Sequence, residues 1–165
     1  MSFLTDLQKC INTKAEIIGK NRNFLIEPKT NTKLSLTTSS SYLLYDFELV
    51  KPRLYPFFAE TENVKGLNSI ADYVIFSEFN DKLWAVVVEL KNGGGNPNAQ
   101  IWGTTLFIDY LVKSVNRQCS KAYKVEHRAI AHSKFKRPPT QLKLKPKHNI
   151  TQAYGDVIEL VNYLK

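Results

Sequence analysis

Two carboxylates and a lysine lie close together along two predicted strands in the middle of the chain. Residues 71–79 and 83–91 are rich in β-branched and aromatic side chains, and the short polar stretch between them is typical of a hairpin turn. A turn of two or four residues pairs Asp72 with Glu89, and strand alternation then places Lys91 on the same face of the sheet. A bulge or an odd-numbered turn would separate the three. The pattern therefore predicts that two carboxylates and an ammonium meet at one end of a hairpin.

This grouping of charges favours metal-assisted hydrolysis of a phosphodiester. Facing carboxylates repel each other across a sheet, and a cation bound between them removes that repulsion. Carboxylate oxygens suit Mg²⁺ or Mn²⁺, which keep coordination positions for water and substrate phosphate. An ammonium beside the metal can hold the attacking water or stabilise the negative charge that develops on the phosphate. The alternative is a strand end on which Glu89 and Lys91 are simply solvated.

The sequence Ala71-Asp72 followed by Glu89-Leu90-Lys91 resembles the signature of the PD-(D/E)XK nuclease superfamily. In that superfamily an acid on one strand and an E-x-K motif on the next lie on a hairpin ahead of a helix. The resemblance implies that Asp72 and Glu89 bind Mg²⁺ or Mn²⁺ and that Lys91 is the catalytic lysine. Ala71 stands where the motif has its proline, a departure that many members share. A member can also keep this site and use it only for binding.

The same resemblance implies further site residues. Gln100 begins the next predicted helix and is similar to the glutamine with which some members contact substrate or orient the lysine. Members also carry an acid in an early helix, for which Glu16 is the obvious counterpart and Glu60 and Glu62 are rivals. The choice among these three acids stays open.

The spacing of apolar residues predicts an α/β protein. The predicted helices cover 3–18, 98–116 and 150–164, and the predicted strands cover 42–50, 71–79, 83–91 and 125–135. Residues 30–41 are rich in Ser and Thr and are expected to form a loop or a short edge strand. Trp84 and Trp102 are expected in the core. We therefore expect one domain over residues 1–165, a mixed central β-sheet flanked by helices, similar to the restriction-endonuclease-like core that the resemblance implies.

The net charge of +8 is concentrated in one part of the chain. Residues 113–147 contain eleven Lys and Arg residues and a single acid, Glu126. Such a cluster attracts a phosphate backbone through counterion release, although a basic surface that serves only solubility gives the same count. The residues expected to contact nucleic acid are Lys124, Arg128, Lys134, Lys136 and Arg137.

The sequence as a whole favours a metal-dependent nuclease that acts on DNA. The alternative is a non-catalytic module that binds nucleic acid through the basic 113–147 segment. A short chain without an attached specificity domain is expected to work as a homodimer or with an accessory protein. Cys10 and Cys119 form no disulfide or zinc pattern, and the longest apolar run has six residues, so we expect a cytoplasmic protein without membrane spans.

Overall fold

The central hairpin has the register that the sequence predicts. In the computed structural model, β4 (Tyr73–Phe79) and β5 (Lys82–Lys91) pair antiparallel, with only Asn80 and Asp81 in the turn. These two residues have φ angles of 52° and 58°, the left-handed backbone that a two-residue type I′ turn requires. Asn and Asp adopt this conformation more readily than other residues with a side chain. The chemistry of the turn therefore fixes how the two strands face each other.

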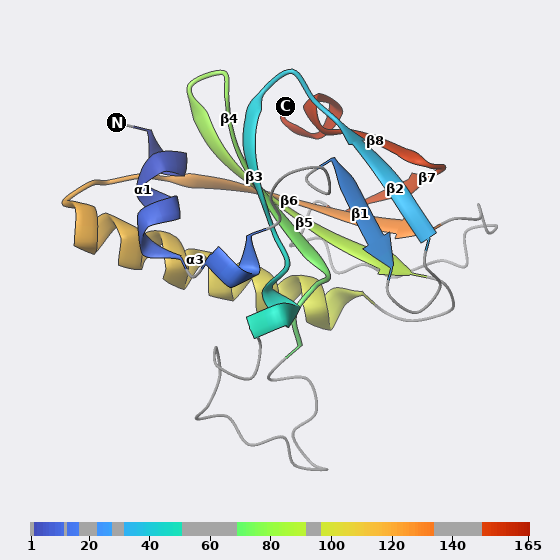
Figure 1. Ribbon diagram of the computed structural model, residues 1–165, viewed down its shortest axis with the longest axis horizontal. Helices are drawn as coiled ribbons and strands as arrows, with labels where there is room; N and C mark the ends of the chain where they lie inside the picture. The colour runs from blue at the N-terminus through green and yellow to red at the C-terminus, as the bar shows by residue number, and fades with distance from the viewer. Residues whose placement is uncertain are drawn as a thin grey trace, which may run out of the picture.

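The structure describes residues 2–11, 13–16, 23–27, 32–50, 69–91, 97–133 and 150–165. Besides the hairpin, these residues form α1 (Phe3–Cys10), α3 (Asn98–Cys119), β1 (Phe24–Glu27), β2 (Thr32–Thr37), β3 (Ser41–Tyr45), β6 (Val125–Ser133), β7 (Ile150–Tyr154) and β8 (Val157–Glu159). The result is a mixed α/β structure with two sheets (Figure 1). Within the described residues, no helix combines the length and the apolar character that a bilayer crossing needs.

The larger sheet has the strand order β3-β4-β5-β6-β7. Its first three strands pair antiparallel, and β5, β6 and β7 run parallel to one another. The predicted mixed central sheet is thus confirmed. A second sheet, with the order β1-β2-β8, was not predicted from the sequence.

Each face of the central sheet packs against a different layer. On one face, Val74 of β4 and Val87 of β5 share a core with residues of α1 and α3. On the other face, Ile75 and Val86 share a core with β1, β2 and β8. Strand alternation sends consecutive residues into these two cores, which explains the continuous apolar run of β5. Figure 1 shows α3 running beneath the sheet. Strands β2 and β8 lie next to each other, away from α3.

The predicted helix over 3–18 is wrong in its extent. The α-helix ends at Cys10, and Ile11 has extended backbone with φ of −91° and ψ of 146°. A short 3₁₀ turn follows at Thr13–Ala15, and Glu16 then forms a bridge to β3. Thr is a residue type whose side chain competes for nearby backbone hydrogen bonds, so Thr13 favours such a break over continued helix.

The predicted C-terminal helix is wrong. Residues 150–164 form β7, β8 and a 3₁₀ turn at Leu160–Tyr163. Gly155 has a φ of +94° between the two strands, a backbone conformation that ends regular structure there. His132 of β6, which is buried, holds this turn because its Nε2 lies 2.7 Å from the Gly155 carbonyl oxygen. Burial lowers the pKa of His132, so the neutral imidazole is the favoured form.

Three other expectations need smaller corrections. The strand expected over 42–50 ends at Tyr45 and is followed by a 3₁₀ turn at Phe47–Val50. The segment expected as a loop or edge strand contains β2, which lies in the middle of the smaller sheet. The helix expected over 98–116 is present and continues to Cys119. β6 ends at Ser133, and the last two residues of its predicted strand lie outside the described residues.

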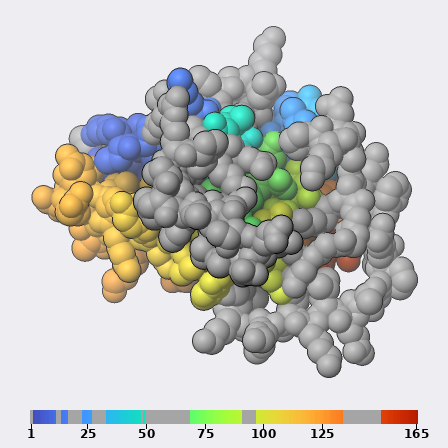
Figure 2. Space-filling model, turned by 90° about the horizontal axis from the view of Figure 1, so that it is seen from below, coloured from blue at the N-terminus to red at the C-terminus, as the bar shows by residue number. Residues whose placement is uncertain are grey.

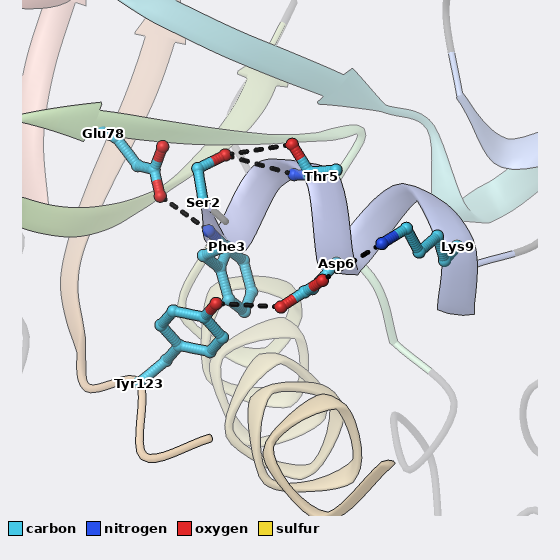
Figure 3. A network of polar contacts seen from close by, with 7 residues as sticks. All are labelled: Ser2, Phe3, Thr5, Asp6, Lys9, Glu78 and Tyr123. Atoms are coloured by element: carbon cyan, nitrogen blue, oxygen red, sulfur yellow. Dashed lines mark hydrogen bonds and ion pairs between the residues drawn. The ribbon is translucent and has the colours of Figure 1, made fainter. Parts of the chain in front are cut away.

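A polar network fastens α1 to the rest of the structure (Figure 3). The Ser2 hydroxyl caps the helix by accepting from the Thr5 backbone N–H at 3.3 Å. The Phe3 backbone N–H donates to Glu78 of β4 at 2.8 Å. Asp6 is buried, and its carboxylate accepts from the Tyr123 hydroxyl at 2.9 Å. This hydrogen bond holds the pKa of Asp6 below its ordinary value of 3.8, while burial, with Asp6 nearby, raises the pKa of Tyr123 to about 12.

Replacing Tyr123 with Phe should therefore destabilise the protein in a pH-dependent way. A carboxylate with a depressed pKa in the folded state adds stability above its ordinary pKa, and that stability is lost as the pH falls through and below that value. We expect the loss of unfolding free energy in Tyr123→Phe to be larger at about pH 7 than at about pH 3, measured by urea denaturation. Tyr154→Phe, at an exposed tyrosine, is the control. Equal losses at both pH values would contradict this assignment.

Candidate functional site

Asp72 and Glu89 occupy facing positions where the hairpin ladder ends. The β4–β5 ladder reaches Tyr73 opposite Val88, so Asp72 and Glu89 are the next facing positions. The Asp72 carboxylate accepts from the Leu90 backbone N–H, with 2.6 Å between Oδ2 and N. The first acid is thereby anchored to the strand that carries the second.

Glu89 lies in the interior of the protein. Its side chain is 2% exposed, and strand alternation places it on the face of Val87, toward α3. The alternative in which Glu89 is a solvated residue at a strand end is therefore wrong for Glu89. Burying an ionised carboxylate is unfavourable unless hydrogen bonds, a cation or a metal ion compensate it. A glutamate in this position therefore needs one of these compensating groups beside it.

Two residues of α3 position the acidic pair against the start of that helix. The Thr104 hydroxyl is buried, accepts from the Ala71 backbone N–H at 2.7 Å and donates to the Gln100 carbonyl at 2.7 Å. Gly103, one residue earlier, lies so close to the other chain segment that a Cβ there would be 2.4 Å from the Ser69 carbonyl oxygen. The first turns of α3 are thus locked against the residues that immediately precede Asp72.

Adding a methyl group at Gly103 should disturb this junction. Ala favours a helix interior over Gly by about 1 kcal/mol, but the 2.4 Å contact with a backbone oxygen forces the helix to move. We expect Gly103→Ala to lose about 1–3 kcal/mol of unfolding free energy in urea denaturation. The control is Gln118→Ala on the exposed side of the same helix, where a change within about 0.5 kcal/mol is expected. A Gly103→Ala variant as stable as the wild type would show that the helix is free to shift.

Lys91 and Gln100 are placed at this end of the sheet by their backbones. Lys91 ends β5, two residues after Glu89, and pairs with Ser133 of β6. Its side chain lies outside the described part of the structure. Gln100 is in the first turn of α3 and is half-buried, with its carbonyl held by Thr104. All four residues of the proposed catalytic set therefore come from elements that converge here.

Glu16 does not join the pair as a third acid. It faces Tyr45 on the outer side of β3, so two strand spacings, about 10 Å, separate it from β4, and three, about 14 Å, separate it from β5. Its carboxylate instead accepts from the Gln8 side chain at 3.0 Å. Glu60 and Glu62 lie outside the described residues. Across the described ranges, no three His, Cys, Asp or Glu side chains are grouped as metal ligands.

The donor set at Asp72 and Glu89 nevertheless fits a hard divalent cation. Two carboxylates supply negative charge and oxygen donors at one point of the sheet. Mg²⁺ is commonly held by one or two carboxylates, with water and substrate phosphate completing its coordination. These residues therefore suit Mg²⁺ or Mn²⁺ better than zinc, which favours sets of Cys and His.

The basic residues predicted to bind nucleic acid have different positions. Lys124 is exposed and precedes β6 at the turn end of the hairpin, about 23 Å along the strand from Glu89 at roughly 3.3 Å per residue. Arg128 lies on the face of the sheet opposite to Glu89. Its guanidinium carbon is 4.6 Å from the centre of the Trp84 ring. Arg128 also donates to the carbonyls of His127 and Lys165, so its guanidinium has partners within the protein. Lys134, Lys136 and Arg137 lie outside the described residues.

No family model, curated protein or solved structure matches this chain. The geometry of the site therefore carries the functional argument.

Thr104 and Gly103 are site residues that sequence reasoning missed. In the sequence, Thr104 is one of the apolar and small residues that recur at helical spacing between 98 and 116. A useful signal was present, since Thr104 follows Gln100 by one helical turn, the spacing at which a Thr hydroxyl reaches a backbone carbonyl. Its second partner, Ala71, comes from another element and cannot be found from the sequence alone.

Proposed function

We propose that this protein is a nuclease of the PD-(D/E)XK type that hydrolyses DNA with the help of Mg²⁺ or Mn²⁺. The proposal is supported by a buried Glu89 whose neighbour Leu90 donates its backbone N–H to Asp72 at the end of the central hairpin. Lys91 follows on the same strand, and Gln100 begins the helix that is locked to this junction. The charges and the order of elements are those that metal-assisted phosphodiester hydrolysis needs.

Each residue has a distinct role in this proposal. Asp72 and Glu89 hold the metal, and the hydrogen bond from Leu90 fixes the direction of the Asp72 carboxylate. When bound, the ion supplies a coordinated water of lowered pKa and a positive charge at the phosphoryl oxygen. The Lys91 ammonium donates a hydrogen bond to the attacking water or to the phosphate, where it stabilises the charge of the transition state. Gln100 contacts substrate or orients Lys91.

The alternative is a non-catalytic module that binds nucleic acid through its basic surface. The buried position of Glu89 favours the nuclease, because a binding surface for phosphate gains nothing from a carboxylate in the interior. The net charge of +8 is consistent with both functions.

A cleavage assay with defined substrates distinguishes the two. Purified protein is incubated with supercoiled, linear, branched and single-stranded DNA, with Mn²⁺, with Mg²⁺ and with a chelator. We expect cleavage that needs the metal and stops when the chelator is added. Binding without cleavage of any substrate would instead support the non-catalytic module.

A further inference from the structure

The solvent-exposed face of α3 carries an unusual row of side chains. Trp102, Leu106 and Tyr110 follow each other at intervals of four residues and are 46%, 51% and 68% exposed. Folded proteins seldom leave such a row of large apolar side chains in water unless it binds something. The expectation that both tryptophans lie in the core is correct for Trp84, which is 2% exposed, and wrong for Trp102. Figure 2 shows atoms of α3, yellow to orange, at the surface on this side of the molecule.

Basic residues continue the same face. Lys113 and Arg117 are exposed and lie about three and about four turns after Trp102, so they project to the same side of the helix. Asp109, the only acid in the sequence of α3, is held by His127 with 2.8 Å between Oδ1 and Nε2. We call the face formed by Trp102, Leu106, Tyr110, Lys113 and Arg117 the α3 track.

We infer that the α3 track binds single-stranded DNA, an inference that rests on the proposed function. Exposed aromatic rings stack on the faces of unpaired bases, and neighbouring cations attract the phosphates. Base faces are hidden inside a duplex, so aromatic side chains of this kind select unpaired strands. The track thus matches a partner that is both aromatic and anionic.

The track lies on the outer side of α3. Trp102 is two residues from Thr104, which turns it about 160° around the helix from the hydroxyl that is bonded to the residue before Asp72. The track therefore faces away from the central sheet, and the acidic site lies on the opposite, buried side of the same helix.

A second copy of the chain is a poorer occupant. With about 150–250 Å² for a whole aromatic side chain, three roughly half-exposed side chains offer on the order of 400 Å². A stable interface needs about 800 Å² from each partner. Each copy also carries a net charge of +8, which opposes association.

Binding of labelled oligonucleotides tests the inference without depending on catalysis. Fluorescence anisotropy is measured in a chelator with a 20-nucleotide oligo-dT strand and with a mixed-sequence duplex of the same length, so that no cleavage occurs. We expect the Trp102→Ala, Tyr110→Ala double variant to bind the single strand at least about tenfold more weakly, with a change below about threefold for the duplex. Tyr154→Ala, which removes an exposed tyrosine from β7, should change neither affinity.

Tryptophan fluorescence provides a second readout. The chain has two tryptophans, and because Trp84 is buried, quenching by bound oligo-dT reports on Trp102. The quenching should disappear in Trp102→Phe, with the fold checked by circular dichroism.

Three results would overturn the inference. They are unchanged single-strand affinity in the double variant, equal losses for single strand and duplex, or a dimer in light scattering that separates when the track is substituted. A protein that binds oligo-dT through the track but never cleaves DNA would keep this inference and reject the nuclease. A protein that cleaves DNA but whose single-strand affinity is unaffected by the track substitutions would keep the nuclease and reject this inference.

Discussion

Glu89→Gln is expected to reduce DNA cleavage by about a thousandfold or more. The substitution keeps the size of the buried side chain and removes the charge that holds the metal. Metal stabilisation of the transition state is worth several kcal/mol, and each 1.36 kcal/mol corresponds to about a tenfold change in rate. DNA affinity measured in a chelator should stay the same or increase, because one negative charge near the phosphate is lost.

The control for Glu89→Gln is Glu126→Gln, at an exposed glutamate of β6, which should cleave as the wild type does. Asp72→Asn is expected to reproduce the loss. Titration calorimetry with Mn²⁺ should show binding heat in the wild type and lose most of it in the Asp72→Asn, Glu89→Gln double variant. Robust cleavage by a folded Glu89→Gln protein, purified free of contaminating nuclease, would reject the proposed active site.

Lys91→Ala is expected to lower the cleavage rate by about a hundredfold to a thousandfold, the range found when one preorganised donor is removed from a transition state. In contrast to the Glu89 variant, Lys91→Ala should still bind Mn²⁺, because its ammonium acts on water or phosphate and is not a ligand. The rate constant for cleavage should fall with little change in DNA affinity.

Lys82→Ala gives a matched control for this lysine. Lys82 is exposed at the other end of the same strand, where its ammonium lies 5.7 Å from the centre of the Trp84 ring. Its replacement should leave cleavage unchanged. Equal losses in Lys82→Ala and Lys91→Ala would indicate a general effect of positive charge and would contradict a catalytic role for Lys91.

The parts of the site that depend on local chemistry could be predicted from the sequence. The register of the hairpin follows from a turn whose residues accept left-handed backbone and from strands whose side chains alternate. The burial of Glu89 could not be predicted in this way, because it depends on α3 packing over the end of β5. The hydrogen bond from the Ala71 backbone N–H to the Thr104 hydroxyl could not be predicted either, because it joins residues from two separate segments.

The C-terminal segment shows why periodicity alone can mislead. Apolar residues from Ile150 to Leu164 recur at spacings of three and four, which suits a helix. The structure instead buries Ala153, Ile158 and Leu164 from strands and turns, because β2 and β6 offer open edges for pairing. The local spacing of apolar residues does not reveal pairing with strands that are so distant in sequence.

The α3 track was missed for a different reason. An apolar residue type indicates a preference for burial and does not say which side of a helix faces water. Trp102, Leu106 and Tyr110 lie on the side opposite the buried Ile108 and Val115, a second apolar stripe that helical spacing could have separated from the first.

The pairing of β2 with β8 has a consequence for the order in which the protein folds. Ser35 faces Val157, so about 120 residues of chain must be brought together before the smaller sheet can close. The β4–β5 hairpin, by contrast, closes over two residues and needs no distant partner. Local contacts form early and distant ones late when loop closure sets the rate. The facing positions of Asp72 and Glu89 at the end of the hairpin should therefore form early in folding, well before the layer behind the sheet is complete.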